Sequence, residues 1–219
     1  KDRWACQDVK RRRQADRAVA VRQWEALYQL LTEGLQVEVE LLPPVPGLPD
    51  LCFTANAGLV HGRTFIRSNF RYPQRQPEEP IVERYARRAG FHVVRLDRRY
   101  HFEGEGDASW MGQTLVVGFR FRSEAPVHEA LARILKARVL PVELADRRFY
   151  HLDTCFCPLN ARQAIWFPKA FDRYGRKVLE SVVPELISVG ASDAKRFVCN
   201  AIVAGHRVVV QEGMSARLQ

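Results

Sequence analysis

The first element that the pattern of apolar and polar residues predicts is an amphipathic helix over residues 16–33. Apolar side chains recur there at three- and four-residue spacing, at Ala20, Trp24, Leu27 and Leu31, which places them on one helical face. Asp16 is a residue type that caps helix N-termini, and Gly34 is one that ends helices. The alternating run of residues 37–41 then predicts a short strand.

Residues 58–66 predict the first β-hairpin, because two short apolar runs flank the turn residues 61–63. The same order of helix, strand and hairpin is predicted three more times along the chain. Helices are expected at about 78–89, 124–136 and 171–183, strands at 92–96, 138–144 and 186–189, a short helical stretch from Asp193, and hairpin turns at 112–113, 160–162 and 205–206.

One polar residue stands just before each predicted hairpin: Asn56, Glu103, His151 and Asn200, separated by 47, 48 and 49 residues. A period this constant, with the same elements inside it, indicates an internal structural repeat. One unit cannot cover both faces of its small sheet, so the copies are expected to pack around a common axis, with sheets inward and helices outward. The four equivalent positions would then converge near the axis.

This convergence would bring a carboxylate, Glu103, beside an imidazole, His151, and such a pair is suited to acid–base catalysis. Continuing the period beyond Asn200 places a fifth position near residue 249, about 30 residues past the last one in the sequence. The chain begins at Lys1 and stops at Gln219, soon after an apolar, strand-like run. We therefore expect a fragment that lacks one member of its site.

The length and composition favour a single globular domain. The 219 residues are 47% hydrophobic and 27% charged, which excludes disorder and collagen-like repetition. No apolar run approaches the roughly 18 to 20 residues that cross a bilayer, and no signal-peptide core opens the chain. Five cysteines in such a chain favour a reduced, cytoplasmic protein over a disulfide framework.

The net charge of +9 is compatible with a nucleic-acid surface. The densest basic run, however, is residues 10–13 near the N-terminus, and neither basic stripes nor aromatic platforms recur at regular spacing. We therefore expect a small-molecule substrate as the partner, rather than nucleic acid or membrane, while a homo-oligomer stays open.

Three motifs give the sequence a resemblance to a known group of proteins: residues 53–58 (FTANAG), 102–107 (FEGEGD) and 151–154 (HLDT). In this order they resemble the guanidine-modifying superfamily of arginine deiminases, dimethylarginine dimethylaminohydrolases, amidinotransferases and arginine dihydrolases. The resemblance covers about residues 16–210 and fits residues 1–14 poorly. It implies that residues 1–219 form one domain, a five-bladed α/β propeller, or pentein, of repeated ββαβ units that is incomplete at both ends.

The resemblance also implies a hydrolase that acts on the guanidino group of arginine, or of a close derivative, through a covalent thiouronium intermediate and without a cofactor. His151 would be the catalytic acid and base, and Glu103 would orient it and balance its charge. Asp153, placed by alternation on the same strand face as His151, would bind the guanidinium. Without the resemblance, His151 can be a satisfied polar residue, Asp153 a turn cap, and Glu105 and Asp107 compete with Glu103.

Asn56 stands where the deiminases and dimethylarginine hydrolases usually have an acid. An amide forms no ion pair with a guanidinium, but it hydrogen-bonds a neutral ureido group equally well. The motif therefore resembles the arginine dihydrolase branch, which hydrolyses arginine past citrulline, although Asn56 can also be a turn former. Arg75 and Arg122 resemble arginines with which the family binds the substrate's carboxylate, and the alternative for both is a solvated side chain.

None of the five cysteines matches the family's nucleophile, which follows a Gly-rich segment near the C-terminus. Cys6 lies in the poorly matched N-terminus, and Cys52, Cys155, Cys157 and Cys199 stand in apolar contexts typical of buried, inert thiols. Cys155 and Cys157 lack the spacing of a zinc site, so no metal is expected. The alternative function is a non-catalytic binding protein, a degenerate propeller that keeps the pocket without the thiol.

Overall fold

The computed structural model describes residues 16–216 and residue 218, and the chain forms two compact units, residues 1–42 and 43–219. In the first unit, α1 (Arg17–Gln29) is capped by Asp16, whose Oδ1 accepts hydrogen bonds from the N–H groups of Ala18 and Val19 at 2.9 and 3.2 Å. A π-helical turn, η2 (Leu30–Gly34), follows. The predicted helix, its cap and its end at Gly34 are confirmed.

The strand predicted for residues 37–41 is wrong. Residues 36–45 have no regular secondary structure, and none of the described strands pairs with them. Alternating polarity is typical of a segment with one covered face, but a strand also needs a neighbour that satisfies its backbone hydrogen bonds. A sequence pattern does not show whether a neighbouring strand is present, and among the described residues there is none for this segment.

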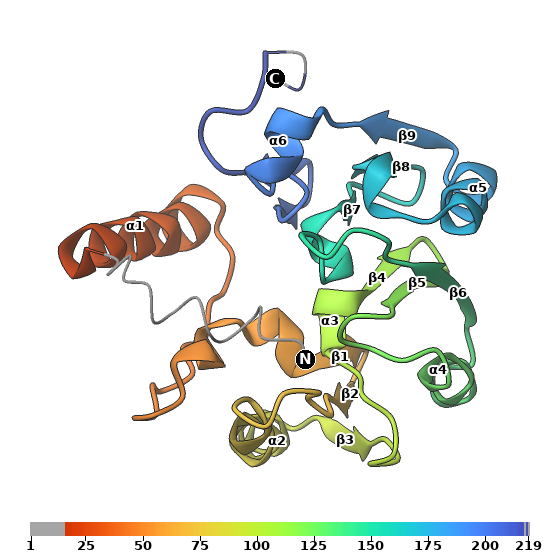
Figure 1. The fold of residues 1–219 in the computed structure, drawn as a ribbon. Helices are drawn as coiled ribbons and strands as arrows, with labels where there is room; N and C mark the ends of the chain where they lie inside the picture. Colours follow the sequence, from red (N-terminus) through yellow and green to blue (C-terminus); the bar gives the residue numbers. More distant parts are fainter. Residues whose placement is uncertain (1–15, 217, 219) are drawn as a thin grey trace. The chain divides into compact units, whose positions relative to one another are not determined.

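The second unit contains three copies of a ββαβ motif (Figure 1). In each copy an antiparallel hairpin is followed by a helix, and the third strand pairs in parallel with the second strand of the hairpin. The first copy is β1 (Gly58–His61), β2 (Thr64–Arg67), α2 (Glu79–Arg88) and β3 (His92–Arg95); the second is β4 (Ala108–Met111), β5 (Thr114–Phe119), α4 (Val127–Leu135) and β6 (Arg138–Glu143); the third is β7 (Phe156–Pro158), β8 (Gln163–Trp166), α5 (Arg173–Val182) and β9 (Glu185–Ser188).

A fourth hairpin, β10 (Ile202–Ala204) and β11 (Arg207–Val209), follows the short helix α6 (Ala191–Lys195). All four predicted hairpins are therefore confirmed. Three of their turns begin at a glycine with φ between 56° and 60°: Gly62, Gly112 and Gly205. Glycine adopts this left-handed conformation without the steric cost that a side chain adds. Three of the four hairpins therefore share the same residue type and backbone conformation at the turn.

Figure 1 shows α2, α4 and α5 on the outer side of their sheets, and the one-turn helix α3 (Gly104–Asp107) on the inner side, where the sheets face one another. The outer helices bury one face each. In α4, Val127 and Leu131 are fully buried in a cluster with Leu115 and Val117 of β5. The predicted arrangement of sheets inward and helices outward is confirmed for the three complete copies.

The segment just before each of the first three hairpins is a short helical turn on the inner side. These turns are the 3-10 turn η4 (Thr54–Ala57), α3, and the 3-10 turn η6 (Leu152–Thr154). The assignment of Asp153 to a strand with His151 is therefore wrong. The carbonyl of His151 accepts hydrogen bonds from the hydroxyl and the N–H of Thr154 at 2.6 and 3.3 Å, which closes a turn at this point, so strand alternation does not relate the two side chains.

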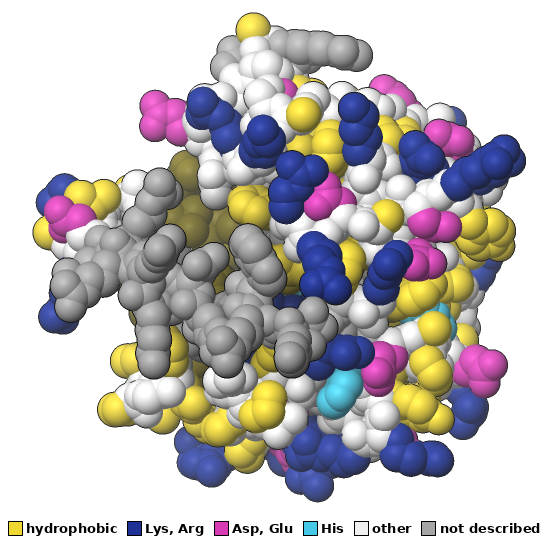
Figure 2. All heavy atoms as spheres, in the orientation of Figure 1, with side chains coloured by type: hydrophobic (Ala, Val, Ile, Leu, Met, Phe, Trp, Pro, Cys, Tyr) yellow, Lys and Arg dark blue, Asp and Glu magenta, His cyan; other side chains and the backbone are white. Residues whose placement is uncertain are grey.

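Among the described residues, no helix has the length and apolar composition of a membrane span. On the face in Figure 2, the Lys and Arg side chains are spread widely and alternate with acidic and apolar side chains. The positive charge seen on this face is therefore distributed rather than gathered into one stripe.

Candidate active site

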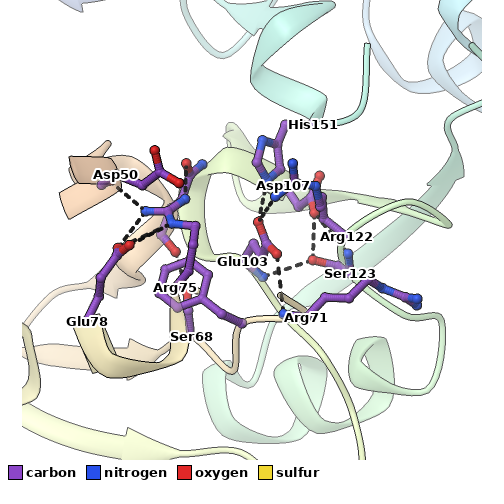
Figure 3. A network of polar contacts seen from close by, with 12 residues as sticks. Asp50, Ser68, Arg71, Arg75, Glu78, Glu103, Asp107, Arg122, Ser123 and His151 are labelled. Carbon is purple, nitrogen blue, oxygen red and sulfur yellow. Dashed lines mark hydrogen bonds and ion pairs between the residues drawn. The ribbon is translucent and has the colours of Figure 1, made fainter. Parts of the chain in front are cut away.

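The centre of the site is a buried pair formed by Glu103 and His151 (Figure 3). Glu103 Oε2 lies 2.7 Å from His151 Nε2, and the two side chains are 0% and 6% exposed. Glu103 precedes α3, and His151 precedes η6 in the next copy of the repeat. Because the carboxylate can only accept, Nε2 carries the shared proton. The convergence that the repeat predicts is confirmed for these two residues.

Arg122 joins the pair, since its Nη1 donates to the same Glu103 oxygen at 3.2 Å. Its guanidinium carbon lies over two aromatic rings, 4.5 Å from the centroid of Tyr72 and 4.6 Å from that of Tyr150. These cation–π contacts help to hold the guanidinium in place. Arg122 is therefore a buried member of the site, not a solvated side chain.

The surroundings stabilise the charged forms of both members of the pair. Burial by itself would raise the pKa of Glu103, but the hydrogen bond and charge of His151, with the charges of Arg122 and Arg75, lower this pKa below its ordinary value. Burial would lower the pKa of His151, but Asp107 and Glu103 together with Asp153 raise it above its ordinary value. The pair is poised as a carboxylate with an imidazole that gains a proton readily.

Asn56 lies beside this pair, and Arg75 fixes the orientation of its amide. Arg75 Nη1 donates to Asn56 Oδ1 at 2.9 Å. Because a guanidinium can only donate, the oxygen of the amide faces Arg75 and the NH₂ group faces the opposite way. The position of Nδ2 is marked by Gly106 of α3, where an added Cβ would overlap Asn56 Nδ2 and lie 3.4 Å from His151 Cδ2. The amide thus presents donors on the side of His151.

Most of the N–H groups of Arg75 donate hydrogen bonds to acceptors within the protein. The buried carboxylate of Glu78 accepts from Nη2 at 2.7 Å and from Nε at 3.0 Å, the carbonyl of Asp50 accepts from Nη2 at 3.0 Å, and the ring of Phe70 lies 4.2 Å from the guanidinium carbon. In this structure Arg75 orients Asn56. Its contact with a substrate carboxylate, which the resemblance implies, stays a prediction.

Asp153 lies next to this group rather than inside it. Its carboxylate interacts electrostatically with His151 and with Asp107, and it is hydrogen-bonded to the side chain of Asn200, the fourth residue of the periodic series. Burial raises the pKa of Asp153 to about 6. Asp153 and Asn200 line a hollow of about 420 Å³ together with Glu105, Cys157 and Cys199. All four periodic positions therefore meet at the inner side of the repeat.

The described cysteines are not activated thiols. Burial raises the pKa of Cys155, of Cys199 and of Cys157, the last to about 11. Cys52 was expected to be buried, and this is wrong: it is exposed at the end of the 3-10 turn η3 (Pro49–Cys52). The pKa of its thiol is also raised. Cys6 lies outside the described residues. Within the described part of the chain, no three His, Cys, Asp or Glu side chains are placed to bind a metal ion.

Sequence reasoning missed the residues that position the site. Glu78 and Asp107 are fully buried acids that contact Arg75 and the His151 turn, and Tyr72 and Tyr150 enclose Arg122. Asp107 was named only as a competitor of Glu103. A signal was present in its motif, because Asp107 ends the FEGEGD segment that also contains Glu103, but its partners come from two distant loops.

The tight fit of α3 leads to a stability prediction. A Cβ at Gly104 would lie 2.5 and 2.6 Å from backbone atoms of Gly58, and its φ is +57°. Gly62 has nearly the same φ, +56°, with nothing within 4 Å of the added Cβ. In urea unfolding, Gly62→Ala should cost about 1 to 2 kcal/mol from the conformation alone, and Gly104→Ala about 1 to 3 kcal/mol more from overpacking. Equal losses would show that α3 is not tightly seated.

No protein-family model matches the chain. The chain is, however, 42% identical over 204 residues to the bifunctional arginine dihydrolase/ornithine cyclodeaminase AgrE of Nostoc sp., a match that covers 91% of this chain and 29% of that protein. It is 34% identical over 195 residues to the N(G),N(G)-dimethylarginine dimethylaminohydrolase of Mycobacterium tuberculosis, covering 89% of this chain and 64% of that protein. The chain thus spans less than two thirds of the length of both relatives.

A solved structure is similar to this chain in both sequence and fold. The N-terminal domain of ArgZ, an arginine dihydrolase from cyanobacteria, was crystallised as a cysteine-to-serine variant bound to substrate. It matches with a TM-score of 0.85 and 40% identity, and the match covers 89% of this chain and 74% of that one. Sequence identity at this level over most of both chains, with the same fold and the site built from the three motifs, shows that the chain belongs to the guanidine-modifying superfamily, in which it is most like the arginine dihydrolases.

Proposed function

We propose that the protein containing this chain hydrolyses the guanidino group of arginine, or of a close derivative. The observation that carries the proposal is the buried Glu103–His151 pair at 2.7 Å, beside the amide donors of Asn56. A carboxylate that orients an imidazole provides a general acid and base next to a substrate-binding surface. The relatives named above, an arginine dihydrolase and a dimethylarginine dimethylaminohydrolase, support this substrate class.

The proposed reaction begins with a thiolate that attacks the central carbon of the guanidinium. His151 donates a proton to the departing nitrogen, so ammonia leaves as the C–N bond breaks and a covalent thiouronium forms. His151 then accepts a proton from water, which attacks the same carbon, releases the thiolate and forms citrulline. Nε2 of His151 is bonded to Glu103, so Nδ1 is the nitrogen that exchanges protons with substrate and water. Asp153 would bind the guanidinium from the neighbouring hollow.

The nucleophilic cysteine in this proposal lies outside the described residues. Cys155, Cys157 and Cys199 are buried and their pKa values are raised, whereas a nucleophile must ionise near neutral pH. The use of a cysteine-to-serine variant to hold substrate in the ArgZ structure supports a cysteine in this role. The repeat would place it in a further unit, which would complete a five-bladed propeller.

The orientation of Asn56 favours a second hydrolysis that converts citrulline into ornithine. A guanidinium presents only donors, whereas the ureido group of citrulline presents an oxygen that accepts. With Oδ1 bonded to Arg75, the NH₂ of Asn56 can bind that oxygen and retain citrulline. A second thiolate attack would release ammonia and leave a thiocarbamate, and water would convert it into a carbamate that decomposes to ornithine and carbon dioxide.

The competing function is a binding protein that keeps the pocket without chemistry. It predicts arginine binding with no turnover in the whole protein, whereas the hydrolase predicts ammonia release. A cytoplasmic location and a small-molecule partner fit both functions, so the assay for ammonia decides between them.

Residues 1–219 alone should not hydrolyse arginine. Three of the four described thiols are buried and the pKa values of all four are raised, so this chain should release no ammonia from arginine above a His151→Ala control, while circular dichroism shows it folded. The whole protein should release ammonia under the same conditions. Turnover by residues 1–219 above the control would show that one of their own cysteines is the nucleophile.

A further inference from the structure

Asp107 is a fully buried carboxylate at the end of α3, and its oxygens accept hydrogen bonds from two distant loops. Oδ1 accepts from the N–H of Leu152 at 3.1 Å, and Oδ2 accepts from the hydroxyl and the N–H of Ser123 at 2.7 and 3.1 Å. Figure 3 shows Asp107 and Ser123 beside the Glu103–His151 pair. Because Asp107 is 0% exposed, these contacts lie inside the protein.

These bonds connect Asp107 to every member of the acid–base pair. Leu152 directly follows His151, so the bond to its N–H fixes the turn from which the imidazole projects. The hydroxyl oxygen of Ser123 accepts from the N–H of Glu103 at 3.0 Å while its hydrogen is donated to Asp107. Ser123 also directly follows Arg122. One carboxylate therefore sets the positions of three site residues from three different loops.

All three partners of Asp107 are donors, so the arrangement requires the ionised carboxylate. Burial raises the pKa of Asp107 to about 6, while the charge of His151 and the bonds from Ser123 and Leu152 oppose this rise. At neutral pH the group is therefore mostly charged. An amide in its place would point an NH₂ group at another donor, either Leu152 N–H or the Ser123 N–H.

The charge of Asp107 also acts on His151. The charged groups around the imidazole are Glu103, Asp107 and Asp153, and Arg122 donates to the same Glu103 oxygen that contacts His151. Each carboxylate favours the imidazolium: the charge of Asp107, the hydrogen bond and charge of Glu103, and the charge of Asp153 all raise the pKa of His151. Glu105, on the same one-turn helix, instead accepts from the N–H of Val60 at 3.0 Å.

We propose that Asp107 is the positioning residue of the site, which sets both the geometry of the Glu103–His151 pair and the protonation of His151 without touching substrate. The part concerning catalysis rests on the proposed function, whereas the part concerning His151 does not. Two carboxylates would then act on one imidazole. Glu103 acts through a direct hydrogen bond, and Asp107 acts through its bond to the N–H of Leu152 and through its charge.

The test is an NMR titration of His151 in the whole protein, with histidine labelled by carbon-13 and His151→Asn used for assignment. Asp107→Asn should lower the pKa of His151, because a negative charge that favours the imidazolium has been removed. Glu105→Gln, the matched control, should leave the pKa unchanged. A His151 pKa that is the same in Asp107→Asn and in the wild type, with the fold retained, would overturn the proposal.

Activity on arginine supplies the second readout. Asp107→Asn should lower kcat about 10- to 100-fold with little change in KM, and the acidic limb of the pH profile should move to lower pH. A loss confined to KM would overturn the positioning role. Absence of turnover in the wild type would instead refute the proposed function, while the titration would still test Asp107.

Ser123→Ala keeps the test decisive if Asp107→Asn does not fold. This variant retains the charge of Asp107 but removes the hydroxyl between Asp107 and the N–H of Glu103. It should lower kcat about tenfold while the pKa of His151 stays raised. Wild-type kcat in Ser123→Ala would contradict the proposal.

Discussion

Replacing Asn56 by aspartate should change the main product of the whole protein from ornithine to citrulline. The carboxylate would accept from Arg75 with one oxygen, as Asn56 Oδ1 does now, and present an acceptor instead of NH₂ on the side of His151. An acceptor binds the donors of the guanidinium but repels the ureido oxygen of citrulline. The first hydrolysis should therefore continue, and citrulline should leave before a second attack.

Chromatography of the products from both forms measures this switch. We expect ornithine from the wild type and a citrulline share that rises about tenfold or more in Asn56→Asp, since a charged hydrogen bond contributes about 1.5 to 3 kcal/mol. Asn160→Asp makes the same charge change in an exposed hairpin turn and should leave the products unchanged. Citrulline from the wild type would place the protein with the deiminases.

Replacing Glu103 by glutamine should have the largest effect on rate. Glu103 Oε2 accepts from both His151 and Arg122, and an amide cannot supply an anionic acceptor to both. The imidazole would lose its orientation and its favourable charge, so kcat should fall about 100- to 10,000-fold, the usual contribution of general acid–base catalysis. Steady-state kinetics with arginine measures this loss.

Glu129→Gln changes an exposed carboxylate on α4 and should retain most of the activity. Circular dichroism and urea unfolding would show that Glu103→Gln is folded. Wild-type kcat in Glu103→Gln would mean that the buried pair is structural and that the chemistry lies elsewhere.

The repeat and its convergence were predictable because they depend on local signals. Apolar periodicity, hairpin turns and one polar residue per copy are all visible in the sequence, and a constant period implies that equivalent residues meet. Glu103 and His151 do meet. The strand expected at 37–41 failed because strand formation depends on a partner that alternation does not reveal.

The side-chain partners within the site were not predictable from the sequence. Arg75 resembles a substrate-binding arginine, but its contacts with Glu78, Asp50 and Asn56 depend on how η3, η4 and the segment before α2 pack. The importance of Asp107 likewise depends on loops 16 and 45 residues away along the chain. Such contacts are determined by tertiary packing, which no local pattern encodes.

The most direct test of the central claim is mass spectrometry of the whole protein after mixing with arginine and quenching in acid. We expect an arginine-derived adduct on one cysteine outside residues 1–219, formed in the wild type and greatly reduced in Glu103→Gln. Product formation without any cysteine adduct, or an adduct on a cysteine within residues 1–219, would contradict this expectation.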